Sequence, residues 1–236
     1  MDRRSFLESC SASAACLSAA VAVSGASWAS NARPKEYARA VLVDERGDPL
    51  KAAALQPQAN YVFNYPFEAT PVFLLDLGKP VAPNTLTTED RQAYVWPGGV
   101  GSRRSIVAYC AICAHELVYP TREVSFISFR KTRAQRGVQD GLIHCCAEHS
   151  QYDPARGAEV LAGPARQPLC AVLLEYDPAT DGLAAHGTLG GELFDRFFEK
   201  YALKLSLDVG PNAHRPVARQ AVVRTLERYS RNPIQC

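Results

Sequence analysis

The sequence predicts a mainly β protein whose C-terminal part is helical. Short β-rich runs bounded by Pro, Gly and Asp recur from residue 40 to residue 186, and apolar residues at helical spacing appear only after residue 190. The chain has 236 residues, 47% of them hydrophobic, which is enough for one or two compact domains. Its formal net charge of +2 means that basic residues barely outnumber acidic ones, so nucleic-acid binding is not expected.

The first 32 residues differ in composition from the rest of the chain. Arg3 and Arg4 precede Ser-Phe-Leu, and residues 9–32 carry no charged side chain. Paired arginines before an uncharged, small and apolar run are typical of a twin-arginine (Tat) export signal. We therefore expect residues 1–32 to be a Tat signal or an N-terminal anchor, through which any membrane association would arise, and the protein to be periplasmic.

The expected strands lie between turn sequences such as Gly47-Asp48-Pro49. The last two β-rich runs flank the turn at residues 177–182 and should form a hairpin. The segments expected to be strands are residues 40–44, 61–63, 71–78, 91–96, 105–109, 124–129, 142–145, 171–176 and 183–186.

Residues 188–236 form the expected helical extension. Apolar side chains recur at helical spacing in residues 192–201, and a second helix is expected from Val217 to Tyr229. Amphipathic helices usually bury their apolar stripe locally, so we expect the extension to cover the flank of its own domain. The alternative is that it holds a partner subunit.

Two short motifs present side chains that bind metals. Cys113 and His115 form a Cys-x-His motif just after an expected strand, and Cys146 and His149 form a Cys-x-x-His motif after thirty intervening residues. Two thiolates with two imidazoles suit either a structural zinc ion or a two-iron cluster with cysteines on one iron and histidines on the other. The motifs by themselves leave both alternatives open.

The motifs and the sequence after them resemble the Rieske iron–sulfur protein family, in particular the Rieske subunits of cytochrome bc-type complexes. The resemblance includes Ser150, Tyr152-Asp153-Pro154 and the loop Gly163-Pro164-Ala165, and it extends over residues 39–187. It implies a Rieske-type antiparallel β-sandwich in residues 33–187. A cluster-binding subdomain, about residues 105–170, would lie at its tip.

The resemblance also implies the residues of the centre. One [2Fe-2S] cluster per chain would be held by Cys113, His115, Cys146 and His149. The family's Ser and Tyr correspond in position to Ser150 and Tyr152, whose hydroxyl groups would donate hydrogen bonds to the cluster and to a ligand sulfur. Such donors stabilise the reduced cluster and raise its potential.

The second loop departs from the family pattern, so the cluster-binding loop is divergent. No residue separates His149 from Ser150, where the family usually has Gly. Val118 and Glu148 stand where two further cysteines would form a disulfide, so that disulfide is not expected. We also hypothesise that the Glu148 carboxylate lowers the cluster potential, because negative charge favours the oxidised cluster.

Four other cysteines follow the predicted signal. Cys110 could pair with Cys145, and Cys170 with Cys236, but connectivity cannot be deduced from the sequence. In an oxidising periplasm such pairs form disulfides, while buried free cysteines are also common.

The resemblance implies a periplasmic one-electron-transfer protein. Its donor would be a quinol or a partner oxidoreductase, and its acceptor a protein such as a c-type cytochrome, within a cytochrome bc-type complex or a periplasmic oxidoreductase. We expect an electron-transfer subunit rather than a stand-alone enzyme. The alternatives are a structural Cys2His2 zinc protein and a clusterless assembly subunit. The basic turn at residues 130–137 is either a docking edge for an acidic partner or a solvated hairpin tip.

Overall fold

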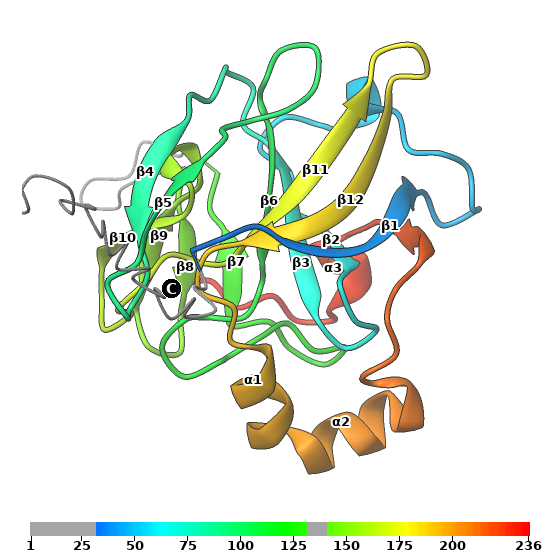
Figure 1. The fold of residues 1–236 in the computed structure, drawn as a ribbon. Coiled ribbons are helices and arrows are strands. Elements are labelled where there is room, and N and C mark those ends of the chain that lie inside the picture. Colours follow the sequence, from blue (N-terminus) through cyan, green and yellow to red (C-terminus); the bar gives the residue numbers. More distant parts are fainter. Residues whose placement is uncertain (1–31, 132–140) are drawn as a thin grey trace, which may run out of the picture.

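The computed structural model describes residues 32–131 and 141–236, and these residues form three β-sheets with a few short helices (Figure 1). One sheet has eight strands, one has four and one has two. The predicted mainly β fold with a partly helical C-terminal region is confirmed.

The eight-stranded sheet is the main body of the protein. Its strand order is β13-β1-β12-β11-β6-β3-β2-β14, and neighbouring strands are antiparallel except for the parallel pair β1 and β13. The strands are β1 (Lys35–Val43), β2 (Tyr61–Asn64), β3 (Pro71–Asp76), β6 (Ile106–Cys110), β11 (Ala171–Asp177), β12 (Gly182–Leu189), β13 (Arg219–Val222) and β14 (Arg224–Thr225).

One short segment covers both edges of this sheet. Strand β13 pairs with β1 at one edge, and β14, two residues further on, pairs with β2 at the other. Between them the Val223 N–H donates a hydrogen bond of 2.8 Å to the Val43 carbonyl oxygen. Residues 219–225 therefore join the two edges and close the sheet on itself, which shields backbone groups that an open edge would expose.

Two smaller sheets lie beside the main one, on the left in Figure 1. The four-stranded antiparallel sheet has the order β10-β9-β8-β7, and β4 and β5 form a separate hairpin. Their bounds are β4 (Asn84–Thr87), β5 (Ala93–Trp96), β7 (Ile127–Phe129), β8 (Ile143–Cys145), β9 (Gln151–Asp153) and β10 (Glu159–Ala162).

The main sheet is buried on both faces, as β3 shows. Phe73 and Leu75 belong to the apolar cluster shared with the smaller sheets, whereas Val72 and Leu74 belong to a second cluster on the opposite face. This alternation follows from the two-residue period of a strand. The shared cluster attaches the smaller sheets to the main sheet, and the Tyr109 hydroxyl adds a hydrogen bond of 2.7 Å to the Pro154 carbonyl oxygen.

The first helix of the C-terminal part covers the flank of its own domain. Phe194 and Phe197 pack in one apolar cluster with Ile112 and Leu117, the residues on either side of the first predicted ligand motif. This confirms that the extension packs on its own domain. The helices are α1 (Phe194–Lys200), α2 (Ala202–Asp208) and the four-residue α3 (Leu226–Tyr229). Helices α1 and α2 lie below the main sheet in Figure 1.

The prediction of one helix from Val217 to Tyr229 is wrong. This segment contains β13, β14 and only the short α3. Its buried side chains include pairs at helical spacing, Val217 with Ala221 and Val223 with Leu226, whereas Ala221 and Val223 alternate as in a strand. Hydrogen bonding to both edges of the main sheet decides in favour of strands, since tertiary pairing routinely overrides local propensity.

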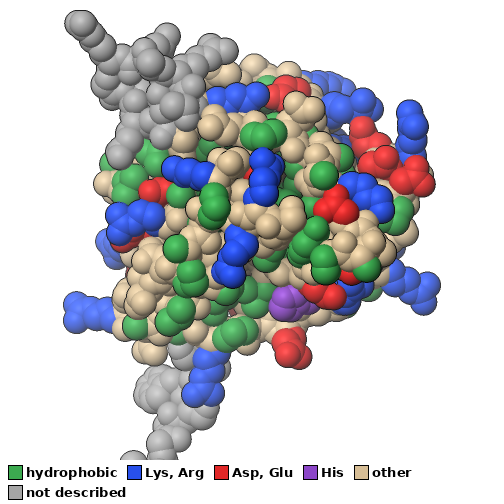
Figure 2. Space-filling view, turned by 90° about the horizontal axis from the view of Figure 1, so that it is seen from above, with side chains coloured by type: hydrophobic (Ala, Val, Ile, Leu, Met, Phe, Trp, Pro, Cys, Tyr) green, Lys and Arg blue, Asp and Glu red, His purple; other side chains and the backbone are tan. Residues whose placement is uncertain are grey.

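Two predicted features lie outside the described residues. The Tat signal falls on residues 1–31, and most of the basic turn falls on residues 132–140. In residues 32–131 and 141–236, no helix is long and apolar enough to cross a membrane. On the face shown in Figure 2, Lys and Arg side chains are interspersed with Asp, Glu and hydrophobic side chains.

The burial of Leu226 gives a test of the closed sheet. Leu226 is 1% exposed, while Leu207 on α2 is 78% exposed. We expect Leu226→Ala to lower the free energy of unfolding by about 2–4 kcal/mol, because it leaves a cavity in the core. Leu207→Ala, the matched control, should change it by less than about 0.5 kcal/mol. Urea unfolding followed by circular dichroism measures both, and equal effects would contradict the packing described.

Candidate metal centre

The first ligand loop follows β6 and folds tightly around Cys113, which is fully buried. The Cys113 N–H donates to the Val118 carbonyl oxygen at 2.8 Å, and the Leu117 N–H donates to the Cys113 carbonyl oxygen at 3.0 Å. The backbone N–H groups of His115 and Glu116 are directed at the Cys113 sulfur. The loop thus surrounds this sulfur with hydrogen-bond donors.

The second loop joins β8 to β9 and is organised around Cys145. The Cys145 N–H donates to the Ser150 carbonyl oxygen at 2.9 Å, which closes the loop over residues 146–149. The N–H groups of Ala147 and Glu148 are directed at the Cys145 sulfur. Each of the two loops therefore encloses one buried cysteine in the same way.

The two buried sulfur atoms meet. The Cys145 thiol donates a hydrogen bond to Cys113, and this bond, together with the Tyr152 hydroxyl and the loop N–H groups, lowers the pKa of Cys113 to about 6. The same bond and burial raise the pKa of Cys145. Two thiols in contact titrate as a pair, and this pair gives up its first proton more readily than an isolated thiol does.

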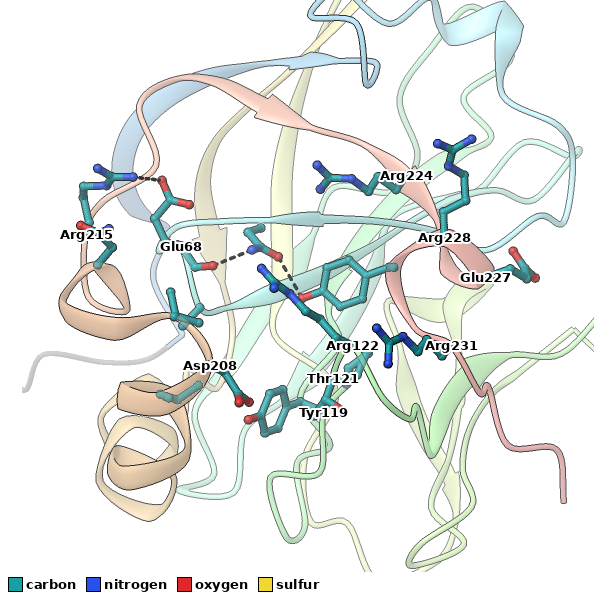
Figure 3. A pocket seen from close by; sticks show the side chains of 17 residues that line it. Glu68, Tyr119, Thr121, Arg122, Asp208, Arg215, Arg224, Glu227, Arg228 and Arg231 are labelled. Carbon is teal, nitrogen blue, oxygen red and sulfur yellow. Dashed lines mark hydrogen bonds and ion pairs between the residues drawn. The ribbon is translucent and has the colours of Figure 1, made fainter.

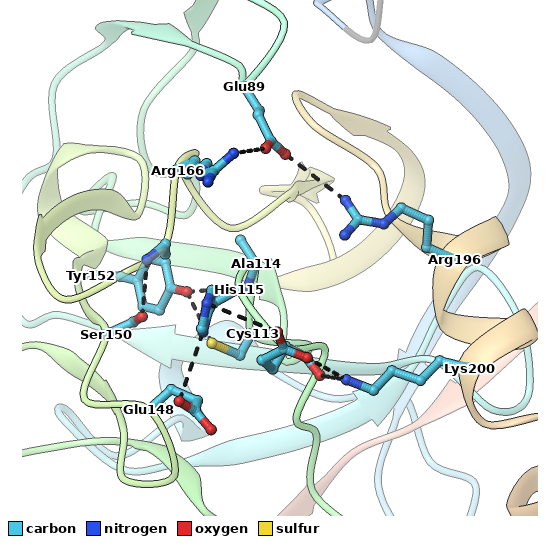
Figure 4. A network of polar contacts seen from close by, with 12 residues as sticks. Glu89, Cys113, Ala114, His115, Glu148, Ser150, Tyr152, Arg166, Arg196 and Lys200 are labelled. Atoms are coloured by element: carbon cyan, nitrogen blue, oxygen red, sulfur yellow. Dashed lines mark hydrogen bonds and ion pairs between the residues drawn. The ribbon is translucent and has the colours of Figure 1, made fainter.

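Tyr152, which follows the second loop in β9, reaches the first loop beside Cys113 (Figure 4). Its hydroxyl oxygen accepts a hydrogen bond of 3.1 Å from the Ala114 N–H and lies 3.2 Å from the Cys113 sulfur. Because the oxygen already accepts from Ala114, its own hydrogen is available for Cys113. The structure thus places Tyr152 where its predicted role, donation to a ligand sulfur, requires it to be.

His115 has a buried ring nitrogen that lacks a hydrogen-bond partner. Among the described residues, nothing hydrogen-bonds to Nδ1 of His115, and this atom lies 3.9 Å from Oε2 of Glu148. The other ring nitrogen, Nε2, is 3.9 Å from Oε1 of Glu116. A buried nitrogen without a partner is costly unless another group binds it. Its place in the loop of Cys113 fits a metal ligand.

Ser150, the other predicted donor, is buried where the second loop meets the loop Gly163-Pro164-Ala165, which we call the proline loop. Its Oγ accepts a hydrogen bond of 3.3 Å from the Ala165 N–H, so its own hydrogen remains available. A Cβ on Gly163 would come within 2.5 Å of the Ser150 Cα. Only glycine allows this close approach, which holds the proline loop against the second ligand loop.

The structure contradicts the prediction that Cys146 is a thiolate ligand. Cys146 forms a disulfide with Cys236, 90 residues further along the chain. Neither of the two pairings that the sequence left open forms, because Cys110, Cys145 and Cys170 are free and buried. Because Cys145 and Cys146 are adjacent, the second ligand motif can be counted from either cysteine. Only the disulfide of Cys146 with Cys236 shows which of the two is free.

His149, the fourth predicted ligand, is exposed and has a left-handed backbone with φ of 57°. Within residues 32–131 and 141–236 it forms no hydrogen bond or ion pair with Cys113, Cys145 or His115. The structure therefore brings together Cys113 and His115 of the predicted set and adds Cys145, but it does not assemble Cys146 and His149 with them. A zinc site made of the predicted Cys2His2 set would need the same two residues.

The disulfide bonds the second loop to the C-terminal residue Cys236, a contact that was not predicted from the sequence. The Val118 carbonyl oxygen supports the first loop by accepting the hydrogen bond from the Cys113 N–H. Arg130 donates hydrogen bonds to the Cys146 sulfur at 2.8 Å and to the Cys236 carbonyl oxygen at 3.0 Å. Arg130, the first residue of the predicted basic turn, therefore holds both ends of the disulfide at the base of the second loop.

A separate cavity of about 630 Å³ lies between α2 and the C-terminal segment (Figure 3). It is lined by five arginines, but several are neutralised. Arg215 is 3.1 Å from Glu68, and Arg228 is 2.8 Å from Glu45. None of the cysteines or histidines of the predicted centre lines this cavity.

Comparisons with known proteins show a likeness in fold. No protein-family model matches the sequence. The structure is similar to the soluble domain of the Rieske protein II (soxF) from Sulfolobus acidocaldarius, with 24% sequence identity and a TM-score of 0.48, over 66% of this chain and 82% of that chain. The assignment of the centre rests on the contacts of Cys113, Cys145 and Tyr152 in this chain rather than on that likeness.

The disulfide can be tested by peptide mapping. After alkylation of the unfolded, unreduced protein and proteolysis, mass spectrometry should find the peptides of Cys146 and Cys236 joined, and Cys113 and Cys145 alkylated, because only the first pair is bonded. A reduced sample, in which all these cysteines are alkylated, is the control. Recovery of Cys145 joined to Cys236 would contradict the assignment.

Proposed function

We propose that this protein transfers single electrons through a [2Fe-2S] cluster of the Rieske type. The observation that carries the proposal is the meeting of two buried sulfur atoms, Cys113 and Cys145, beside the buried and unpartnered Nδ1 of His115. Two thiolates with an imidazole close by are three of the four donors of a Rieske centre, and they are not the ligands of a site that binds its metal through oxygen. We assign Cys113 and Cys145 to one iron and His115 to the other.

The residues around the pair have defined roles. A bound [2Fe-2S] cluster supplies a reversible one-electron couple. Tyr152 and the loop N–H groups donate hydrogen bonds to the ligand sulfurs, which stabilises the added negative charge of the reduced state. The side chain of His115 is 30% exposed, so its Nε2 edge is where an electron or a proton reaches solvent or a partner.

The surroundings of His115 suit a contact with a partner. Lys200 of α1 lies 2.6 Å from the Glu116 carboxylate and also donates to the Glu116 carbonyl oxygen at 2.7 Å. This ion pair fixes the rim of the first loop. Because α1 and the rim are held together, a partner that docks at His115 meets a preformed surface.

The export route and partners are part of the proposal. We propose that residues 1–32 direct Tat export and that the protein works in the periplasm, as an electron-transfer subunit between a quinol or an oxidoreductase and an acceptor such as a c-type cytochrome. The disulfide between Cys146 and Cys236 supports an oxidising compartment, since such bonds are rare in the cytosol. The Arg3-Arg4 pair supports the Tat route.

The cluster can be tested with cysteine variants. Protein purified from the periplasm should contain about two iron and two sulfide per chain and give a rhombic EPR signal after reduction with dithionite. Cys113→Ala and Cys145→Ala should abolish the signal, because each removes a ligand. Cys170→Ala, which removes a buried free thiol outside the centre, should retain it. A signal that survives Cys145→Ala, or a folded protein containing only zinc, would contradict the proposal.

Tyr152→Phe tests the role of the hydroxyl. The variant removes one hydrogen bond to a ligand sulfur and leaves the ring in the core, so the midpoint potential should fall. A bond worth about 1 kcal/mol corresponds to about 40 mV for one electron. Protein-film voltammetry measures the shift. Tyr94→Phe, a buried tyrosine outside both ligand loops, is the control and should leave the potential unchanged.

A further inference from the structure

The second loop matches the Rieske pattern when it is counted from Cys145 instead of Cys146. Counted from Cys146, the residue expected between the last ligand and Ser150 is missing. Counted from Cys145, the sequence is Cys145-x-x-Glu148, one intervening residue, then Ser150 and Tyr152. The spacing is restored without a gap, and the cysteine it starts from is the free one that meets Cys113.

The backbone at His149 supports this register. Its φ of 57° lies in the left-handed region, which a residue without a Cβ adopts most readily. When the loop is counted from Cys145, His149 lies between the fourth ligand position and Ser150, where the Rieske family usually has Gly. His149 therefore supplies a turn conformation there, and its exposed side chain is not needed as a ligand.

When the loop is counted from Cys145, the residue at the fourth ligand position is Glu148. Its N–H is directed at the Cys145 sulfur, so its backbone already belongs to the shell of that sulfur. Its carboxylate oxygen Oε2 lies 3.9 Å from Nδ1 of His115, the buried nitrogen without a hydrogen-bond partner. That separation is too long for a hydrogen bond. The two atoms are therefore close together without a hydrogen bond between them, and both are of a kind that binds iron.

We propose that Glu148 is the fourth protein ligand of the cluster, so that Cys113 and Cys145 hold one iron while His115 and Glu148 hold the other. The inference rests on the proposed function. A carboxylate oxygen is a competent iron ligand, as in sites that combine histidine with carboxylate. It differs from an imidazole in carrying a negative charge, which favours the oxidised cluster. Such a centre has one coordinating histidine instead of two.

Counting the coordinating histidines tests the assignment. The full-length protein, grown with 15N-histidine in a 14N background, is reduced and examined by pulsed EPR. We expect coupling to the nitrogens of one histidine in the wild type, and the same coupling in His149→Ala. Glu148→His should show two histidines and a positive shift of the midpoint potential. Glu116→His, at the neighbouring carboxylate near the other ring nitrogen of His115, should still show one.

The outcomes separate this inference from the proposed function. Two coupled histidines in the wild type, one of them lost in His149→Ala, would overturn the role of Glu148 and leave the cluster in place. The absence of any [2Fe-2S] signal in the wild type would overturn both.

A second measurement serves if Glu148→His does not fold. Iron content is titrated against a chelator for the wild type, Glu148→Asp and Glu148→Ala. Loss of the carboxylate in Glu148→Ala should weaken iron retention by at least about tenfold, with substantial recovery in Glu148→Asp. Circular dichroism of the chelated proteins shows whether the fold is intact. Unchanged iron retention in Glu148→Ala would overturn the inference.

Discussion

The contact between the Cys113 and Cys145 sulfur atoms is the constraint to which the surrounding structure conforms. Cys113 comes from a loop of the main sheet and Cys145 from a hairpin of the four-stranded sheet, so the two sheets must be held in a fixed relation for the atoms to meet. The shared apolar core provides this, and Tyr152 reinforces it by bonding to both the first loop and its sulfur. Because dense packing leaves little room for adjustment, the core also fixes the geometry of the centre.

The contact between the two sulfur atoms also explains why hydrogen-bond donors are placed around them. Two buried sulfurs that carry negative charge are unfavourable in an apolar core unless donors surround them. Each ligand loop directs two backbone N–H groups at its own sulfur. Backbone donors are fixed by the turn and need no further ordering when a cluster binds, so the loops are preorganised for the charged state. The exposed rim carries the ion pair of Glu116 and Lys200.

Local signals predicted most of the fold and half of the centre. Strand runs and the Cys113 motif were found because each depends on residues close together in sequence. The register of the second loop was not, because Cys145 and Cys146 both begin suitable spacings and the bond that distinguishes them joins Cys146 to a residue 90 positions away. The strands within Val217–Tyr229 were missed for the same reason, since their partners, β1 and β2, lie far earlier in the chain.

The disulfide has a consequence for the order in which the protein is completed. Cys236 is synthesised 90 residues after Cys146, so the second loop keeps two neighbouring thiols until that part of the chain exists and an oxidant is present. In the proposed centre, either of these two cysteines is a possible ligand while both are reduced. The disulfide with Cys236 removes Cys146 from that choice and leaves Cys145 as the free thiol of the loop. The last residue of the chain thereby determines which of two neighbouring cysteines the second loop can offer.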